Sequence, residues 1–229
     1  MNKISKSANQ TTLFRKNLMA LTGLFLCLFL VVHLAGNLQL LLPPEEASAQ
    51  FNLYSKFMTG NPLIKMVSYL LYASIIAHVV FALIITLKNR QAANSIYVYD
   101  LRGKASNWYS RNMGALGSII LLFLIVHMKD FWYEYKFGSL PLDSEGNKDL
   151  YTIVINSFSE LWYVALYTVS FIALGYHLLH GFNSAFKTLG AYPRKLSRIL
   201  YYLSIGLTCI LTLGFIIIPI VVYFKYHLT

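Results

Sequence analysis

Five stretches of the sequence lack any charged side chain, and each is long enough to cross a membrane. They run over residues 17–44, 66–87, 112–128, 161–186 and 199–224. A helix needs about 20 apolar residues to cross the roughly 30 Å hydrocarbon core of a bilayer. Strands of a membrane barrel would be shorter and would alternate apolar with polar residues, which these stretches do not. The sequence therefore predicts a single all-α integral membrane bundle over residues 1–229, with five transmembrane helices at roughly 14–42, 63–88, 108–134, 152–188 and 195–225.

The low content of charged residues agrees with this interpretation. Charged residues make up 12% of the chain, about half of what is usual in soluble domains. The net charge of +10 does not indicate nucleic-acid binding, because the basic residues flank the apolar stretches. Cys27 and Cys209 both lie within apolar stretches and fit neither a disulfide framework nor a zinc site. The loops are too short for a catalytic domain, so any chemistry must come from within the bundle or from a partner.

The basic residues are unevenly divided between the two ends of the predicted bundle. The end that holds the N-terminus carries every arginine and most of the 19 basic residues: Lys3, Lys6, Arg15, Lys16, Lys88, Arg90, Arg102, Lys104, Arg111, Lys187, Arg194, Lys195 and Arg198. Such residues concentrate on the cytoplasmic side of membrane proteins. We therefore expect a cytoplasmic N-terminus and an outside C-terminus, and we name the two halves of each span inner and outer accordingly.

Histidines inside the predicted spans are the strongest functional signal, because ionisable groups within a membrane are costly and usually functional. His33 of the first span and His127 of the third lie in the outer half, whereas His78 of the second and His177 of the fourth lie in the inner half. Two histidines at each depth, on different helices, are what two stacked haems need, since each iron takes one imidazole on either face. Helix–helix hydrogen bonding, a proton relay and a metal transporter are the alternatives. A transporter should carry carboxylates inside its spans, but the five charge-free stretches hold none, and Asp130 and Glu160 lie only at the outer margins.

Glycines accompany two of these histidines. Gly36 lies three residues after His33, and Gly181 lies four residues after His177. A glycine lets the backbone approach a flat macrocycle closely, which would give Gly36 a role beside a haem. Tight packing of small residues between helices explains the same glycines without any cofactor.

Four segments together resemble a known family. They are HLAGN at 33–37, the single histidine of the second span, HMKDFW at 127–132 and GYHLLHGFNSAFKTLG at 175–190. Over nearly the whole chain they are similar to the dihaem cytochrome b membrane anchor, of the b558 type, of succinate dehydrogenase and fumarate reductase. The resemblance implies a multi-pass subunit of the bacterial inner membrane that binds a flavoprotein and an iron–sulfur subunit at the cytoplasmic face. It would pass electrons from succinate through two b haems to a quinone, commonly menaquinone, while succinate chemistry would belong to the flavoprotein.

The resemblance also implies the ligand of each haem iron. His33 and His127 would hold the distal haem, and His78 and His177 the proximal one. His180 lies three residues after His177 and is an alternative ligand or a contact for a haem propionate. Family members keep the histidine that lies four residues before the glycine, which favours His177.

The outer margin near the distal haem holds candidates for a quinone site, namely Asp130, Glu160, Trp132 and Trp162. Tryptophans at that depth more often belong to the aromatic belt of a membrane protein. Two other functions stay open at this point. One is a cytochrome b anchor of another respiratory enzyme, of the hydrogenase or formate dehydrogenase type, and the other is a haem-free transporter.

Overall fold

The structure is a computed structural model, and it describes residues 3–92 and 106–228. The predicted inner-side residues Arg102 and Lys104 lie outside these described residues. The elements are α1 (Lys3–Asn37), η1 (Leu38–Leu41), α2 (Pro44–Gly60), α3 (Pro62–Ala92), α5 (Trp108–Arg111), α6 (Met113–His127), η2 (Met128–Tyr133), α7 (Glu134–Phe137), α8 (Leu150–Phe158), α9 (Leu161–Thr188) and α10 (Ser197–Leu228). Among the described residues, β structure is limited to one isolated bridge between Leu142 and Lys148.

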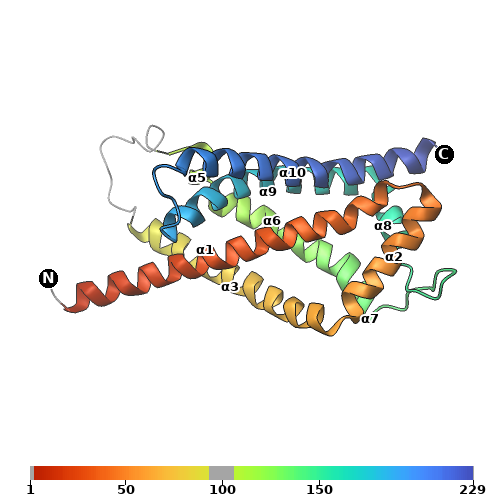
Figure 1. Ribbon diagram of the computed structural model, residues 1–229, viewed down its shortest axis with the longest axis horizontal. Helices are drawn as coiled ribbons and strands as arrows, with labels where there is room; N and C mark the ends of the chain where they lie inside the picture. The colour runs from red at the N-terminus through yellow and green to blue at the C-terminus, as the bar shows by residue number, and fades with distance from the viewer. Residues whose placement is uncertain (1–2, 93–105, 229) are drawn as a thin grey trace.

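Five helical segments are long and apolar enough to cross a membrane. They are Leu13–Leu41, Pro62–Gln91, Met113–Phe137, Leu161–Thr188 and Ser197–His227. This result confirms the predicted all-α bundle of five transmembrane helices and makes the chain a multi-pass membrane protein. The two termini lie at opposite ends of the bundle (Figure 1), while the direction in which the bundle sits in a membrane stays a prediction.

Polar residues and prolines set the boundaries of these helices. Pro62 begins α3, where its missing N–H costs nothing, and the Asn61 side chain accepts hydrogen bonds from the backbone N–H groups of Leu63 and Ile64 at 2.9 and 3.3 Å. Asn61 therefore caps the free end of the helix. Pro219 lies inside α10, which continues through it.

Two predicted spans differ from the observed helices. The fourth, over 152–188, is two helices, because α8 ends at Phe158 and α9 begins at Leu161. The Glu160 carbonyl accepts from the backbone N–H groups of Tyr163 and Val164 and starts the new helix. The third, over 108–134, begins later: α6 starts at Met113, and it continues through the π-helical turn η2 into α7.

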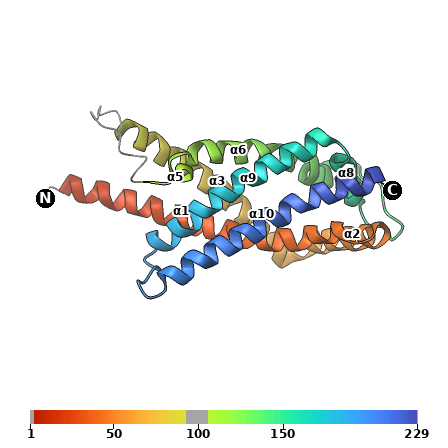
Figure 2. The same cartoon turned by 90° about the horizontal axis from the view of Figure 1, so that it is seen from above.

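Four of the long helices form a ring, and the fifth packs on its outside. The neighbours around the ring are α1 and α3, α3 and α6, α6 and α9, and α9 and α1, whereas α10 packs against α9 and α1. Seen from above, α10 crosses the bundle alongside α9 (Figure 2). Within the ring, α1 therefore faces α6 and α3 faces α9 across the centre of the bundle.

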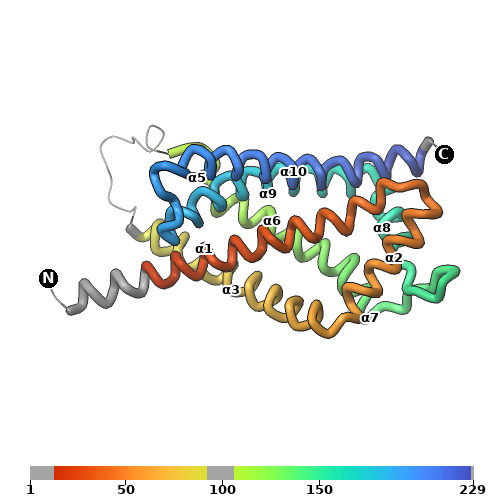
Figure 3. Tube along the Cα trace, viewed as in Figure 1, coloured from red at the N-terminus to blue at the C-terminus, as the bar shows by residue number. Residues whose placement is uncertain are grey.

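A cluster of buried hydrophobic side chains includes members of α8, α9 and α10. Leu211, Phe215, Ile218 and Val222 form a buried stripe with helical spacing along α10. Close approach of the helices depends on small residues, and a Cβ atom at Gly214 would lie 2.7 Å from the Leu34 side chain of α1. The short helices α2, α7 and α8 gather at the end where α10 finishes, and the chain between α7 and α8 extends beyond them (Figure 3).

Candidate functional site

Two histidine pairs lie inside the ring of four helices. We call His33 of α1 and His127 of α6 the His33 pair, and their ring centres are 5.7 Å apart. His78 of α3 and His177 of α9 form the His78 pair, with ring centres 6.2 Å apart. These are the pairs that depth along the spans predicts. Each pair joins helices that face each other across the ring, so both pairs lie at the centre of the bundle.

The spacing within each pair fits two ligands on opposite sides of one metal ion. An imidazole binds a metal through one nitrogen at about 2 Å, and its ring centre lies about 1 Å farther away. Two such imidazoles across one metal therefore have ring centres roughly 6 Å apart. All four side chains are partly buried.

Each pair offers a metal two imidazole ligands, which is enough only when other ligands come from a cofactor. In the part of the chain that the structure describes, no three His, Cys, Asp or Glu side chains gather as they would around a bare metal ion. Protein sites for zinc use three or four side chains. A haem iron takes its in-plane ligands from the macrocycle and needs one protein ligand on each face. Two histidines per level therefore fit a haem better than a bare metal ion.

Aromatic side chains surround the His33 pair. The His33 ring stacks on Phe29 at 5.2 Å between centroids and lies 5.9 Å from the ring of Phe215. The His127 ring stacks on Phe123 at 5.5 Å and meets Phe131 edge-on at 5.4 Å. These contacts place both imidazole rings in largely apolar surroundings.

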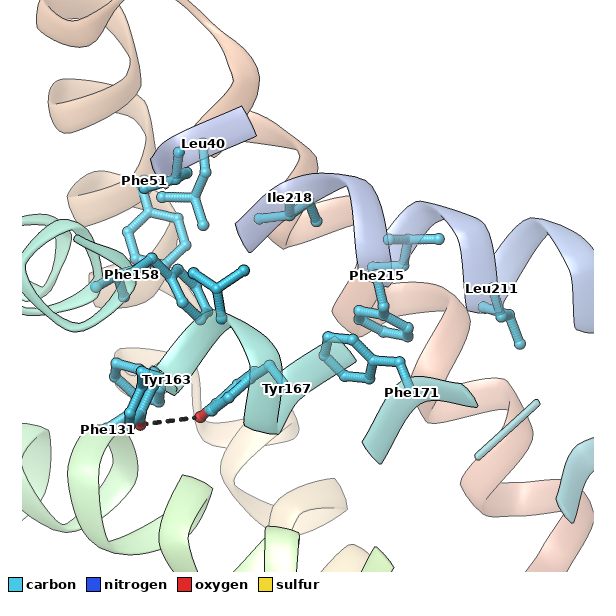
Figure 4. Packing of buried hydrophobic residues seen from close by; sticks show 14 of the residues in the cluster. Leu40, Phe51, Phe131, Phe158, Tyr163, Tyr167, Phe171, Leu211, Phe215 and Ile218 are labelled. Atoms are coloured by element: carbon cyan, nitrogen blue, oxygen red, sulfur yellow. Dashed lines mark hydrogen bonds between the residues drawn. The ribbon is translucent and has the colours of Figure 1, made fainter. Parts of the chain in front are cut away.

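A chain of hydrogen bonds leads from this pair towards the surface. The Nδ1 atom of His127 lies 3.1 Å from the Tyr167 hydroxyl, which lies 3.2 Å from the Tyr163 hydroxyl. Figure 4 shows the contact between the two tyrosines, which lie one turn apart on α9. The Tyr163 hydroxyl donates to Asp130 at 3.0 Å, and Lys129 donates to the same carboxylate at 3.0 Å. The chain therefore joins a membrane-buried imidazole to an exposed lysine.

The His78 pair has smaller neighbours. The Nδ1 atom of His78 lies 3.2 Å from the Thr22 hydroxyl. A Cβ atom at Gly23 would lie 3.3 Å from the His78 ring, and one at Gly117 would lie 3.8 Å from the His177 ring. The buried Nδ1 atom of His177 has no hydrogen-bond partner among the described residues. A buried nitrogen without a partner is unfavourable, so this nitrogen lacks a partner that a bound group could supply.

His180 has a different environment from His177. Its Nδ1 atom lies 2.8 Å from the hydroxyl of Ser110 in α5. His177, and not His180, forms the ring contact with His78. The geometry thus gives His177 the position expected of a ligand and gives His180 a position at the edge of the bundle.

The predicted quinone-site residues have different surroundings. Asp130 is joined to the His33 pair through the two tyrosines, whereas Glu160 and Trp162 are exposed. The Trp132 indole donates to the Tyr72 hydroxyl at 2.7 Å. The structure thus brings only Asp130 of the quinone candidates into the hydrogen-bonded surroundings of the His33 pair.

The space beside Gly36 is taken by a side chain of α2. A Cβ atom at Gly36 would lie 2.5 Å from the ring of Tyr54. In this structure the glycine therefore allows close packing of Tyr54 against α1, which is the packing explanation given above for such glycines.

Sequence reasoning missed Tyr163, Tyr167 and Thr22. The two tyrosines lie four residues apart in an apolar span, and side chains at that spacing share one helix face. That spacing was the available signal. Thr22 gave no comparable signal, because its link to His78 crosses from one helix to another.

Fold and site together define a multi-pass helical membrane protein whose bundle centre carries two pairs of histidines. Comparisons with protein-family models, curated proteins and solved structures give no match for this chain.

Proposed function

We propose that the chain is the dihaem cytochrome b subunit that anchors a succinate:quinone oxidoreductase in the membrane. The observation that carries this proposal is the presence of two histidine pairs at the centre of one helical bundle. The ring centres are 5.7 Å apart in the His33 pair and 6.2 Å apart in the His78 pair. The four sequence segments that resemble the b558-type anchors of succinate dehydrogenase and fumarate reductase lead to the same proposal. It is an electron-transfer and quinone-reactive subunit, and the oxidation of succinate belongs to its partner.

Five of the six histidines have a role in this proposal. His33 and His127 hold the distal haem, and His78 and His177 hold the proximal one. A haem supplies an iron that accepts and passes on one electron at a time. The aromatic side chains around the His33 pair exclude water, and the Thr22 hydroxyl orients the His78 ring. His180 remains available to a propionate group at the edge of the bundle.

The partners and the location follow from the resemblance and from the charge distribution. The end of the bundle that carries the arginines faces the cytoplasm and binds the iron–sulfur and flavoprotein subunits. Supporting this direction, basic residues favour the cytoplasmic side of the bacterial inner membrane. The quinone, in this proposal menaquinone, reacts near the His33 pair at the other end, where Asp130 offers a carboxylate and Trp132 an apolar surface.

The test is a reduced-minus-oxidised spectrum of the protein purified with its partners, together with its haem content. We expect haem b absorbance, two haems per chain, and a co-purifying subunit with covalently bound flavin. Absence of haem b would exclude every cytochrome and leave the transporter. Haem b with partners that lack covalent flavin would favour the anchor of a hydrogenase or formate dehydrogenase.

A further inference from the structure

The hydrogen-bond chain behind His127 has a fixed direction, and this direction determines which nitrogen of His127 carries a proton. The chain runs from the His127 Nδ1 atom through Tyr167 and Tyr163 to Asp130. Tyr167 and Tyr163 are 2% and 4% exposed, so no bulk water competes for their hydroxyls. Each hydroxyl has a single O–H to donate.

The direction starts at the carboxylate. Lys129 donates to one oxygen of Asp130 at 3.0 Å, and the side chain of Lys129 is 76% exposed, as expected for a charged ammonium group. An ionised carboxylate only accepts hydrogen bonds. Tyr163 therefore donates its one O–H to Asp130. In its contact with Tyr167, the Tyr163 oxygen can then only accept.

The same step repeats at the next hydroxyl. Because Tyr167 donates to Tyr163, its oxygen is left as an acceptor towards His127. The contact of 3.1 Å at His127 Nδ1 then requires an N–H on that nitrogen. A neutral imidazole carries one N–H, so its Nε2 atom keeps a free lone pair.

We infer that Asp130, acting through Tyr163 and Tyr167, holds His127 in the tautomer with the proton on Nδ1 and so leaves Nε2 free to bind a metal. Tyr163, Tyr167 and Asp130 are positioning residues, since none of them touches the proposed iron. The inference rests on the proposed function only for the identity of the metal, because the tautomer is a property of the chain itself. Partners that fix a ligating histidine in this way commonly change metal affinity by about 10- to 100-fold when they are removed.

The first experiment needs no haem. The full chain is labelled with ¹⁵N in its histidines, prepared in detergent without haem at neutral pH, and examined by NMR, with the His127 signals assigned from a His127→Gln variant. We expect His127 in the Nδ1–H tautomer. Finding the Nε2–H tautomer in the wild-type chain would overturn the inference.

Two conservative variants test the direction of the chain. In Asp130→Asn the amide can donate to Tyr163, and in Tyr163→Phe the hydroxyl of Tyr167 is free to donate to His127. Both should shift His127 towards the Nε2–H tautomer. An unchanged tautomer in both variants, with helix content by circular dichroism equal to that of the wild type, would refute the relay. Ser110→Ala removes the partner of His180 instead and is the matched control, for which His127 should not change.

Haem titration of the same proteins then separates this inference from the proposed function. If the wild type binds haem, Asp130→Asn and Tyr163→Phe should weaken one of the two sites by roughly 10- to 100-fold and leave the other unchanged. Equal weakening of both sites would indicate a general loss of structure and would count against the relay. If the wild type binds no haem, the proposed function fails, while the NMR result still decides the tautomer.

Discussion

The two histidine pairs have nearly the same spacing but very different surroundings. The His33 pair lies among phenylalanine rings and is connected through two tyrosines to a carboxylate. The His78 pair has one threonine hydroxyl, two glycines and, within the described part of the chain, an unpartnered His177 nitrogen. Spacing sets what a pair can bind, whereas hydrogen bonds and burial set the reduction potential of a bound haem. For the proposed cytochrome we therefore expect two haems of similar ligation that titrate at different potentials.

The largest expected effect is the loss of one haem, and it tests which histidine completes the His78 pair. In the proposed cytochrome, His177→Ala should remove one of the two haems and leave the potential of the other, because His177, and not His180, forms the ring contact with His78 in the described structure. His180→Ala is the matched variant, and it should keep both haems. Haem content and a redox titration of the purified complex measure both results. Retention of both haems in His177→Ala with loss of one in His180→Ala would reverse the assignment.

The sequence predicted much of this comparison, because its two main signals are local to each helix. Absence of charge over about 20 residues reports a membrane span whatever packs against it, and the five spans are confirmed. Distance from the span ends predicts which histidines share a level, and the structure brings these same pairs together. Both features can be read from the sequence without knowing which helices contact one another.

What surrounds each pair could not be predicted, since it depends on contacts between helices. Tyr167 reaches His127 only because α6 and α9 are neighbours in the ring. Gly36 was read as room for a haem, yet Tyr54 of α2 lies against it, and α2 is a helix outside the predicted spans. The break at Ser159 and Glu160 was also missed, because one turn of polar residues at the membrane margin does not reveal a change of helix.

A core substitution beside the His33 pair should be the next largest effect. Phe215 is 5% exposed, stacks on Phe171 at 5.3 Å and lies 5.9 Å from the His33 ring. Phe215→Ala should lower the free energy of unfolding by about 3–5 kcal/mol, because it leaves a cavity in a packed region. Leu213→Ala on the same helix is the control, since Leu213 is 58% exposed and should change stability far less. Unfolding in mixed detergent micelles provides the measurement, and equal effects from both variants would contradict the packing described.

A smaller effect is expected at the hydroxyl beside His78. The Thr22 hydroxyl donates to the backbone carbonyl of Leu18 at 2.8 Å, so it accepts from His78 Nδ1. Thr22→Val keeps the shape of the side chain but removes the hydroxyl that accepts from this N–H, which should cost about 1 kcal/mol. It should also shift the potential of one haem only.

Thr208 offers a matched control for this variant. Its buried hydroxyl has no hydrogen-bond partner among the described residues. Thr208→Val should therefore be neutral or slightly stabilising. If Thr22→Val shifted both haem potentials equally, the separation of the two pairs would be wrong.

The smallest expected effect is confined to the loop beyond the His33 pair. Asn52 of α2 is fully buried and donates to Asp143 at 3.2 Å and to Asp149 at 3.1 Å. Burial acts to raise the pKa of Asp143, but hydrogen bonds from Asn147, Asn52 and the Glu145 N–H outweigh it and hold the pKa below the ordinary 3.8. The pKa of Asp149 is lowered in the same way, with hydrogen bonds from Thr152 and Asn52 outweighing burial.

A lowered carboxyl pKa stabilises the folded loop above the ordinary pKa, and this stabilisation is lost as the pH falls through the folded-state value. Amide exchange in residues 138–149, corrected for intrinsic rates, should therefore become less protected below about pH 4. In Asn52→Leu the loop should be less protected at every pH, and protection should depend less on pH, because the shared donor to both carboxylates is gone. Exchange around His78 should not change over the same range. A parallel loss of protection in residues 138–149 and around His78 would mean that acid loosens the whole bundle and does not act through the Asn52 contact.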